Sequence, residues 1–192
     1  DNGETDIDCG GVCPTKCALL RKCEVGGDCD LGVCTNKMCD KPPGLVGAWP
    51  LHTNGQNALG VAKPSIMYEG SYSETSHRGS PLLAATFGGA AGSLLETTLG
   101  STFTFAAWIK PRSPVDTARN AIVGSAYAGA QSEAGFIWFM NSQGKDDLSL
   151  HFQTGDGSNG ADFHTGPNAL TADVWQHVAV VVDRATKSVT FF

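Results

Sequence analysis

Seven cysteines are the residues of this sequence whose type and spacing point most directly to chemistry. All of them lie within residues 9–39 of the 192-residue chain. Zinc sites favour two cysteines separated by two residues, a spacing that is absent here, and all five histidines lie outside the cluster. The pattern therefore predicts disulfides, and with them an extracellular location. The cysteines are Cys9, Cys13, Cys17, Cys23, Cys29, Cys34 and Cys39.

An odd number of cysteines leaves one of them without a partner inside this chain. Three interpretations stay open for it: a bridge to a cysteine upstream of Asp1, a bridge to a second chain, or a free thiol. The pairing of the others cannot be read from spacing either. A segment of about 40 residues buries too little apolar surface to fold alone, so we expect the bridges to replace a core.

Carboxylates in two parts of the chain carry the oxygen donors that Ca²⁺ prefers. Three acids alternate near the N-terminus and would share one face of an extended segment. Two more lie in expected loops of the second half. In both places the alternative is an ordinary set of solvated acids. The candidate calcium ligands are Glu4, Asp6, Asp8, Asp156 and Asp162.

Aromatic side chains carry the chemistry for stacking on sugar rings. All four tryptophans lie on expected strands, where filling a core is their ordinary role, and we expect this of Trp49 and Trp175. Trp108 shares an alternation face with Thr104 and Lys110, so we expect it to be more exposed. The candidates for glycan stacking are Trp108, Tyr127 and Phe163.

Several functional classes are disfavoured by what the sequence lacks. A net charge of −6 provides no electrostatic footprint for nucleic acid. No apolar run is long enough to span a bilayer, so we expect no membrane insertion in this segment. There is no G-x-S-x-G nucleophile motif and no carboxylate pattern of a jelly-roll glycosidase, so we expect no enzyme.

The elements that position these residues fall into two parts. We expect residues 1–40 to form a disulfide-rich module, with one helical turn at 18–22, and residues 41–44 to form a Pro-rich joint. Residues 45–192 read as short strands separated by polar turns, which predicts an all-β antiparallel sandwich or barrel. The clearest strand candidates are 102–110, 121–126, 135–140, 147–153, 174–183 and 187–192.

Four motifs across residues 44–192 resemble the laminin-G-like, concanavalin-A-like jelly-roll family. They are GLVGAWPL, LLAATFGG, FTFAAWIKPRS and WQHVAVVVDRATKSVTFF. The resemblance implies a two-sheet antiparallel jelly-roll sandwich, often with one Ca²⁺ at a loop rim. The family pattern continues beyond Phe192, so we expect either a fragment of a longer chain, which we favour, or a partner chain that supplies the missing strands.

The stretch NGETDIDCGGVCPTKC resembles a cysteine-rich repeat of secreted surface proteins from microbes and algae. In that family an extra cysteine tends to precede the Asn-Gly pair. The resemblance therefore implies an upstream partner for the odd cysteine.

These patterns together predict an extracellular structural or adhesive module of a larger surface or appendage glycoprotein. We expect its partners to be glycans or neighbouring extracellular chains, and Ca²⁺ is the one candidate cofactor. Two alternatives stay open. One is a dedicated lectin-like carbohydrate-binding domain, and the other is a self-assembling subunit of a homo-oligomer or fibre, completed by a partner strand.

Overall fold

The chain forms two compact units, which we describe separately. The first includes Asp1–Pro50 and Gln56–Pro64, and the second includes Leu51–Gly55 and Ser65–Phe192. This division falls after the joint expected at residues 41–44, and the predicted domain bounds stay a prediction. The computed structural model describes residues 3–49, 57–59, 66–68, 71–75, 84–86, 92–94, 99–112, 120–125, 134–142 and 144–192.

The first unit, which we call the cysteine module over residues 3–49, contains little regular structure. A 3₁₀ turn, η1 (Gly26–Asp28), precedes a hairpin of β1 (Val33–Thr35) and β2 (Met38–Asp40). The two residues of the hairpin turn, Asn36 and Lys37, both have positive φ, as a tight turn between twisted strands requires.

The helical turn expected at residues 18–22 is wrong. Leu20 has a φ of 64°, which lies outside the right-handed helical region. Its backbone N–H instead donates to the carbonyl of Cys39 at 2.9 Å, and Cys39 donates to Arg21. Pairing with the distant β2 strand therefore overrides the local helix preference of this segment.

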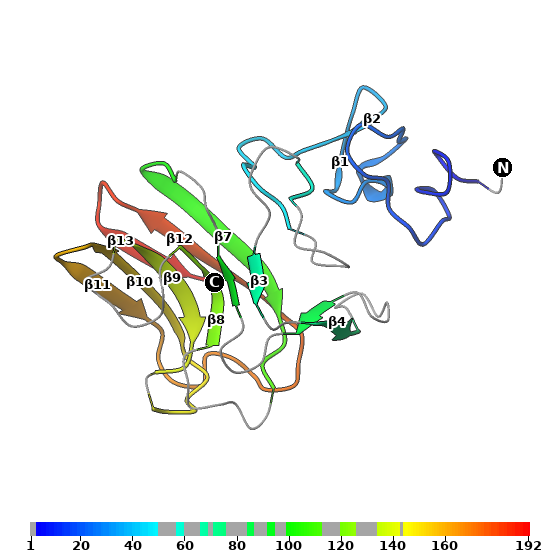
Figure 1. Cartoon of the computed structure of the whole chain (residues 1–192). Coiled ribbons are helices and arrows are strands. Elements are labelled where there is room, and N and C mark those ends of the chain that lie inside the picture. The colour runs from blue at the N-terminus through cyan, green and yellow to red at the C-terminus, as the bar shows by residue number, and fades with distance from the viewer. Residues whose placement is uncertain are drawn as a thin grey trace. The chain divides into compact units, whose positions relative to one another are not determined.

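The second unit is built from antiparallel strands, as the all-β prediction required (Figure 1). Its described residues contain no α-helix. Among all the described residues of the chain, no helix is long and apolar enough to cross a membrane. The strands are β3 (Ile66–Tyr68), β4 (Ser71–Glu74), β5 (Ala84–Thr86), β6 (Gly92–Leu94), β7 (Thr102–Ile109), β8 (Asn120–Gly124), β9 (Ala134–Met140), β10 (Leu150–Asp156), β11 (Gly160–His164), β12 (Gln176–Asp183) and β13 (Ser188–Phe191).

Two of the sheets pack face to face as a sandwich. The larger has the strand order β11-β10-β9-β8-β6-β3, and the smaller has the order β13-β12-β7. Figure 1 shows the smaller sheet lying as a layer against β8–β11. Every pairing is antiparallel except the single parallel contact of β6 with β8.

Aromatic rings from both sheets fill the space between them. Phe105 of β7 lies 5.0 Å from Phe136 of β9, and Phe136 stacks on Phe152 of β10 at 5.9 Å between ring centroids. Alternate residues of β12, including the fully buried Val180, complete this layer. The period-two pattern of β7 therefore directs Phe103 and Phe105 into the core.

Most of the strands predicted in the second half are confirmed, with one displacement and one omission. The strand expected at 147–153 begins only at Leu150, because the preceding residues, 144–149, form a hydrogen-bonded loop with Asn141 and Ser142. The strand β11 was missed, since Gly160 and Asp162 lower its strand propensity. Its pairing with β10 compensates for that weak local preference.

Candidate functional site

The outer surface of the β13-β12-β7 sheet carries an exposed tryptophan. Because Phe103 and Phe105 of β7 point inward, the strand period turns Trp108 outward, and it is 48% exposed. Its ring meets the ring of His177 on β12 edge to face, with 5.4 Å between centroids. The sequence prediction that Trp108 is more exposed than a core tryptophan is confirmed.

Small side chains lie beside this tryptophan on the same sheet surface. Ala106 of β7 is paired with Ala179 of β12, two residues along each strand from the Trp108–His177 pair and therefore on the same side of the sheet. We call the surface formed by Trp108, His177, Ala106 and Ala179 the Trp108 face. A flat indole beside small side chains can stack on the apolar side of a sugar ring, because an aromatic ring combines a large apolar area with a fixed shape.

The other aromatic candidates are not brought to the Trp108 face. Phe163 of β11 is paired with Phe152 of β10 and shares its inward side of the sheet, where it is half-buried. Tyr127 lies outside the described residues. Of the tryptophans expected in the core, Trp49 and Trp175 are half-buried, whereas Trp138 is fully buried.

A second polar cluster lies where the loop before β10 meets the larger sheet. The carboxylate of Asp147 accepts hydrogen bonds from the backbone N–H and hydroxyl of Ser142, at 3.1 and 2.5 Å. It accepts the same two bonds from Ser149, at 3.2 and 2.6 Å. Partial burial acts to raise the pKa of Asp147, but the bonds from Ser142 and Ser149 outweigh it and hold that pKa well below its usual range.

This cluster continues through a histidine to a second carboxylate. Nε2 of His151 lies 2.9 Å from the hydroxyl of Ser149, and Nδ1 lies 3.3 Å from Asp162. The order Asp–His–Ser is that of a hydrolytic triad. However, Ser149 is 2% exposed and gives its only hydroxyl proton to Asp147. It therefore offers no accessible nucleophile, and the cluster fastens the loop to the sheet.

Replacing Asp147 with asparagine is expected to lower the free energy of unfolding by about 1–3 kcal/mol at neutral pH, because charge-assisted bonds to a partly buried group are lost. Since folding lowers the pKa of Asp147, its stabilising contribution is full above the unfolded value and declines as pH falls through the folded value. Urea unfolding at pH 7 and pH 3 measures this difference.

The neighbouring exposed acid, Asp146, provides the matched control for Asp147. Asp146→Asn should leave unfolding unchanged at both pH values. Equal stability of Asp147→Asn and the parent protein at pH 7 would show that the loop does not depend on this carboxylate.

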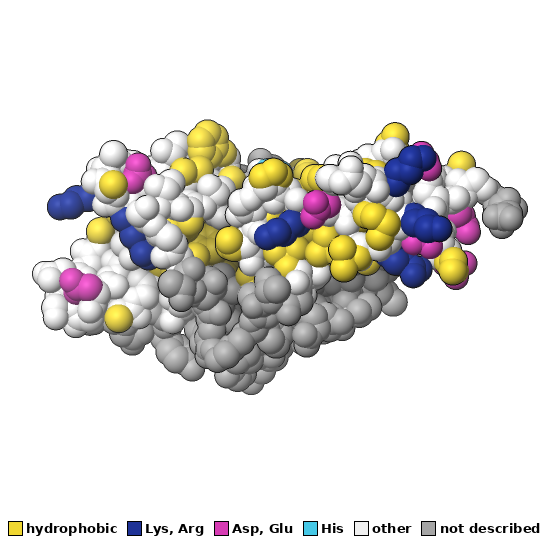
Figure 2. All heavy atoms as spheres, turned by 90° about the horizontal axis from the view of Figure 1, so that it is seen from above, with side chains coloured by type: hydrophobic (Ala, Val, Ile, Leu, Met, Phe, Trp, Pro, Cys, Tyr) yellow, Lys and Arg dark blue, Asp and Glu magenta, His cyan; other side chains and the backbone are white. Residues whose placement is uncertain are grey.

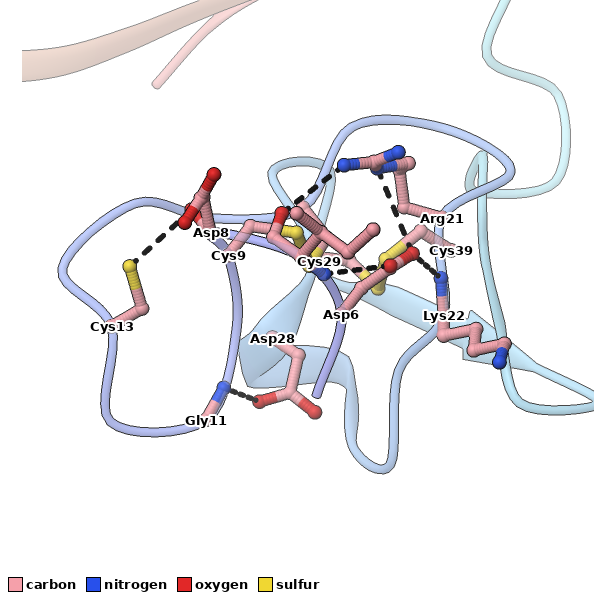
Figure 3. Close-up of a disulfide and its surroundings, with 12 residues drawn as sticks. Asp6, Asp8, Cys9, Gly11, Cys13, Arg21, Lys22, Asp28, Cys29 and Cys39 are labelled. Atoms are coloured by element: carbon pink, nitrogen blue, oxygen red, sulfur yellow. Dashed lines mark hydrogen bonds and ion pairs between the residues drawn. A yellow bond between two sulfur atoms is a disulfide. The ribbon is translucent and has the colours of Figure 1, made fainter. Parts of the chain in front are cut away.

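The predicted disulfides are present in the cysteine module. They join Cys9 to Cys17, Cys23 to Cys34, and Cys29 to Cys39. The odd residue is Cys13, whose free thiol lies 3.5 Å from the backbone carbonyl of Asp8 (Figure 3). An upstream or intermolecular partner for it stays a prediction.

The described residues contain one group of three side chains of metal-ligand type that lie close together. The sulfurs of Cys23, Cys29 and Cys39 are within 4.8 Å of one another and are buried. All three belong to disulfides, so they are not the thiolates that a metal would require. Their proximity instead forms the sulfur-rich core that stabilises the module.

The three N-terminal acids do not lie on one extended face. The chain turns at Ile7 and Asp8, with reciprocal backbone bonds between Asp6 and Cys9, and Asp8 has a φ of 57°. Asp6 accepts backbone bonds from Lys22 at 2.8 Å and Ile7 at 2.7 Å, which lower its pKa (Figure 3). Asp6 thus fastens the N-terminal segment to the module. Calcium binding by Glu4, Asp6 and Asp8 stays a prediction.

Asp28 is an acid of the module that sequence reasoning missed. It is 4% exposed and accepts backbone hydrogen bonds from Val25, Glu24 and Gly11, at 3.0, 2.8 and 2.8 Å. These bonds lower the pKa of Asp28. The only local signal is the Gly26-Gly27 pair before it, since the contact with Gly11 joins residues far apart in the chain.

The two calcium candidates of the sandwich are also engaged separately. Asp156 accepts backbone bonds from Asn159 and Ser158 in the β10–β11 turn, which lower its pKa. Asp162 contacts His151 and accepts a bond from Gln153 at 3.2 Å. The described residues do not bring these two acids into one cluster with a third ligand, and calcium binding here stays a prediction.

The surface charges visible in Figure 2 are mixed. Basic and acidic side chains alternate with apolar ones on the face shown, and no broad area of a single charge is seen.

The comparisons with known proteins bear on the sandwich. The laminin-G family model described as the concanavalin A-like lectin/glucanases superfamily matches residues 87–192, more than half of the chain. No curated protein and no solved structure matches. The resemblance of the N-terminal segment to a cysteine-rich surface repeat stays a prediction. The matched span holds every strand from β6 to β13, which are all the strands of the smaller sheet and all those of the larger sheet except β3. The chain therefore belongs to the concanavalin A-like lectin/glucanase superfamily.

Proposed function

We propose that this chain is a non-catalytic, extracellular adhesive module of a larger surface or appendage glycoprotein, and that its sandwich binds glycans. The family membership supports a binding role, and the three disulfides support an oxidising compartment. The observation that carries the glycan proposal is the exposed indole of Trp108 beside Ala106 and Ala179.

The placement of Trp108 leaves much of a large aromatic ring in contact with solvent. The strand period would accept a small or polar residue on this outward position, as it does at Thr104 and Ala106. A large ring that is 48% exposed instead presents apolar area to solvent. Sugar rings have an apolar side of matching size, and their hydroxyls can remain solvated while that side stacks.

The non-catalytic part of the proposal rests on the polar cluster of the larger sheet. Its Asp162, His151 and Ser149 have the order of a triad, but the hydroxyl is buried and committed to Asp147. The hydroxyl of Ser142, 3.3 Å from Nε2 of His151, likewise donates its proton to Asp147, so neither serine gives its proton to the histidine.

Trp108→Ala is expected to weaken glycan binding about tenfold, because buried aromatic anchors dominate small binding sites. A printed glycan array identifies a ligand for the purified chain, and titration calorimetry then compares the variants. Trp108→Phe keeps a stacking ring and should retain most of the affinity, and Thr104→Ala on the same strand should bind like the parent. Undiminished binding by Trp108→Ala, or no binding to any glycan on the array, would contradict the proposal.

A further inference from the structure

We propose that the Trp108 face selects acidic glycans, with Lys110 binding the carboxylate or sulfate group of the sugar that stacks on Trp108. This inference rests on the proposed glycan-binding function and adds the chemical class of its ligand. Its evidence is the position of Lys110, the absence of a competing partner for it among the described residues, and the charged residues described beside it.

Lys110 follows Trp108 by two residues, directly after the end of β7. Residues two apart in an extended segment lie on the same side, about 7 Å apart along it. An acidic group at the edge of a ring that covers the indole would therefore lie within reach of a lysine side chain. Lys110 is exposed, so its ammonium group can approach such a ligand from solvent.

The ammonium group of Lys110 is available for a ligand. Within the described part of the chain its side chain makes no hydrogen bond or ion pair, in contrast to Lys37, which is paired with Glu24 at 3.4 Å. An unpaired lysine loses no existing partner when it binds an anion. The free energy of this interaction therefore depends on the Coulomb attraction between the ammonium group and the anion, and on the side-chain entropy that Lys110 loses on binding.

The charged residues described at this end of the Trp108 face are mostly basic, although the whole chain has a net charge of −6. Lys110 and Arg112 contribute two positive charges. Asp173, whose backbone donates to Pro111 at 2.6 Å, contributes one negative charge. The described residues at this end thus sum to +1, and both Arg112 and Asp173 make other interactions. A local positive charge beside an aromatic surface favours an anionic sugar over a neutral one.

A second exposed lysine provides a matched control. Lys187 lies in the turn between β12 and β13, near Asp183, whose carboxylate accepts backbone bonds from Ala185 and Thr186. It has the same charge and is exposed, but it lies at the opposite end of β12 from the residue paired with Trp108. A purely non-specific attraction would depend equally on both lysines.

The test uses pairs of polysaccharides that differ only in charge. Polygalacturonate is compared with its methyl ester, and a sulfated galactan with its desulfated form. The purified chain and its Lys110→Gln, Lys187→Gln and Trp108→Ala variants are titrated against each at low and at physiological salt. We expect the parent to bind a charged polymer about fivefold more tightly than its neutral form, with the preference reduced by salt.

Lys110→Gln should abolish this preference and keep the affinity for the neutral polymer, whereas Lys187→Gln should keep both. A preference confined to the carboxylate pair or to the sulfate pair supports the proposal and identifies the acidic group. Retained preference in Lys110→Gln, or an equal loss in both lysine variants, would overturn the proposal and leave glycan binding intact. Undiminished binding by Trp108→Ala would instead overturn the glycan-binding function itself.

Discussion

Replacing both Cys29 and Cys39 with alanine is expected to unfold the cysteine module while the sandwich remains folded. This bridge closes a loop with a sequence separation of 10. Its removal raises the conformational entropy of the unfolded chain, which lowers the free energy of unfolding by about 3 kcal/mol in the chain-entropy description. The buried apolar cluster of the module is made of cysteines alone, so the described residues 3–49 offer no second apolar cluster that could compensate. A domain of this size rarely has more than about 3–5 kcal/mol of stability in total.

Hydrogen exchange followed by mass spectrometry measures this effect region by region. Residues 3–49 should lose protection in the double variant, and residues 99–112 and 144–192 should keep theirs. Cys13→Ser is the matched control, because the Cys13 thiol is outside the sulfur cluster and should leave exchange unchanged. Normal protection of residues 3–49 in the double variant would show that the two remaining disulfides and the backbone hydrogen bonds of the module are sufficient for folding.

Phe152→Ala is expected to destabilise the sandwich by about 3–5 kcal/mol, the largest single-residue effect that we anticipate. Phe152 is fully buried, stacks on Phe136 at 5.9 Å, and lies 6.2 Å from Phe103 of the opposite sheet. Removing its ring leaves a cavity between the two layers that rigid strands cannot collapse to fill.

Urea unfolding followed by circular dichroism measures the loss at Phe152. Phe152→Leu keeps most of the buried volume and should cost less than half as much. Trp108→Ala removes a ring of similar size from the surface and should change stability little. A loss below about 1 kcal/mol for Phe152→Ala would show that the sandwich core can repack.

The regular strands could be predicted because their signal is local. In β7 the alternation of Phe103, Phe105 and Trp108 shows both the strand and the side of the sheet on which each residue lies. The strand β11 could not be found this way. Its residues Gly160–His164 form a strand because β10 offers a complementary edge, and that edge is remote in sequence from any local signal.

The candidate sites were predicted to different degrees for the same reason. The exposure of Trp108 follows from its strand period, so it was foreseen. The inward position of Phe163 depends on its register with Phe152 across β10 and β11, which no local pattern reveals. The roles of Asp28 and Asp147 depend on backbone N–H groups that loops bring to them, so their carboxylates looked like any other polar residues.

By itself the sequence determined which physical forces stabilise each part of this protein. The clustering of seven cysteines made disulfides the source of stability for the first unit, and period-two hydrophobicity made an all-β antiparallel fold of the second. The tertiary structure alone decided which cysteines pair, leaving Cys13 outside the three bridges of the described residues, and which acids serve as hydrogen-bond acceptors. Composition and period are properties of neighbours along the chain, whereas pairing requires residues distant in sequence to meet in space.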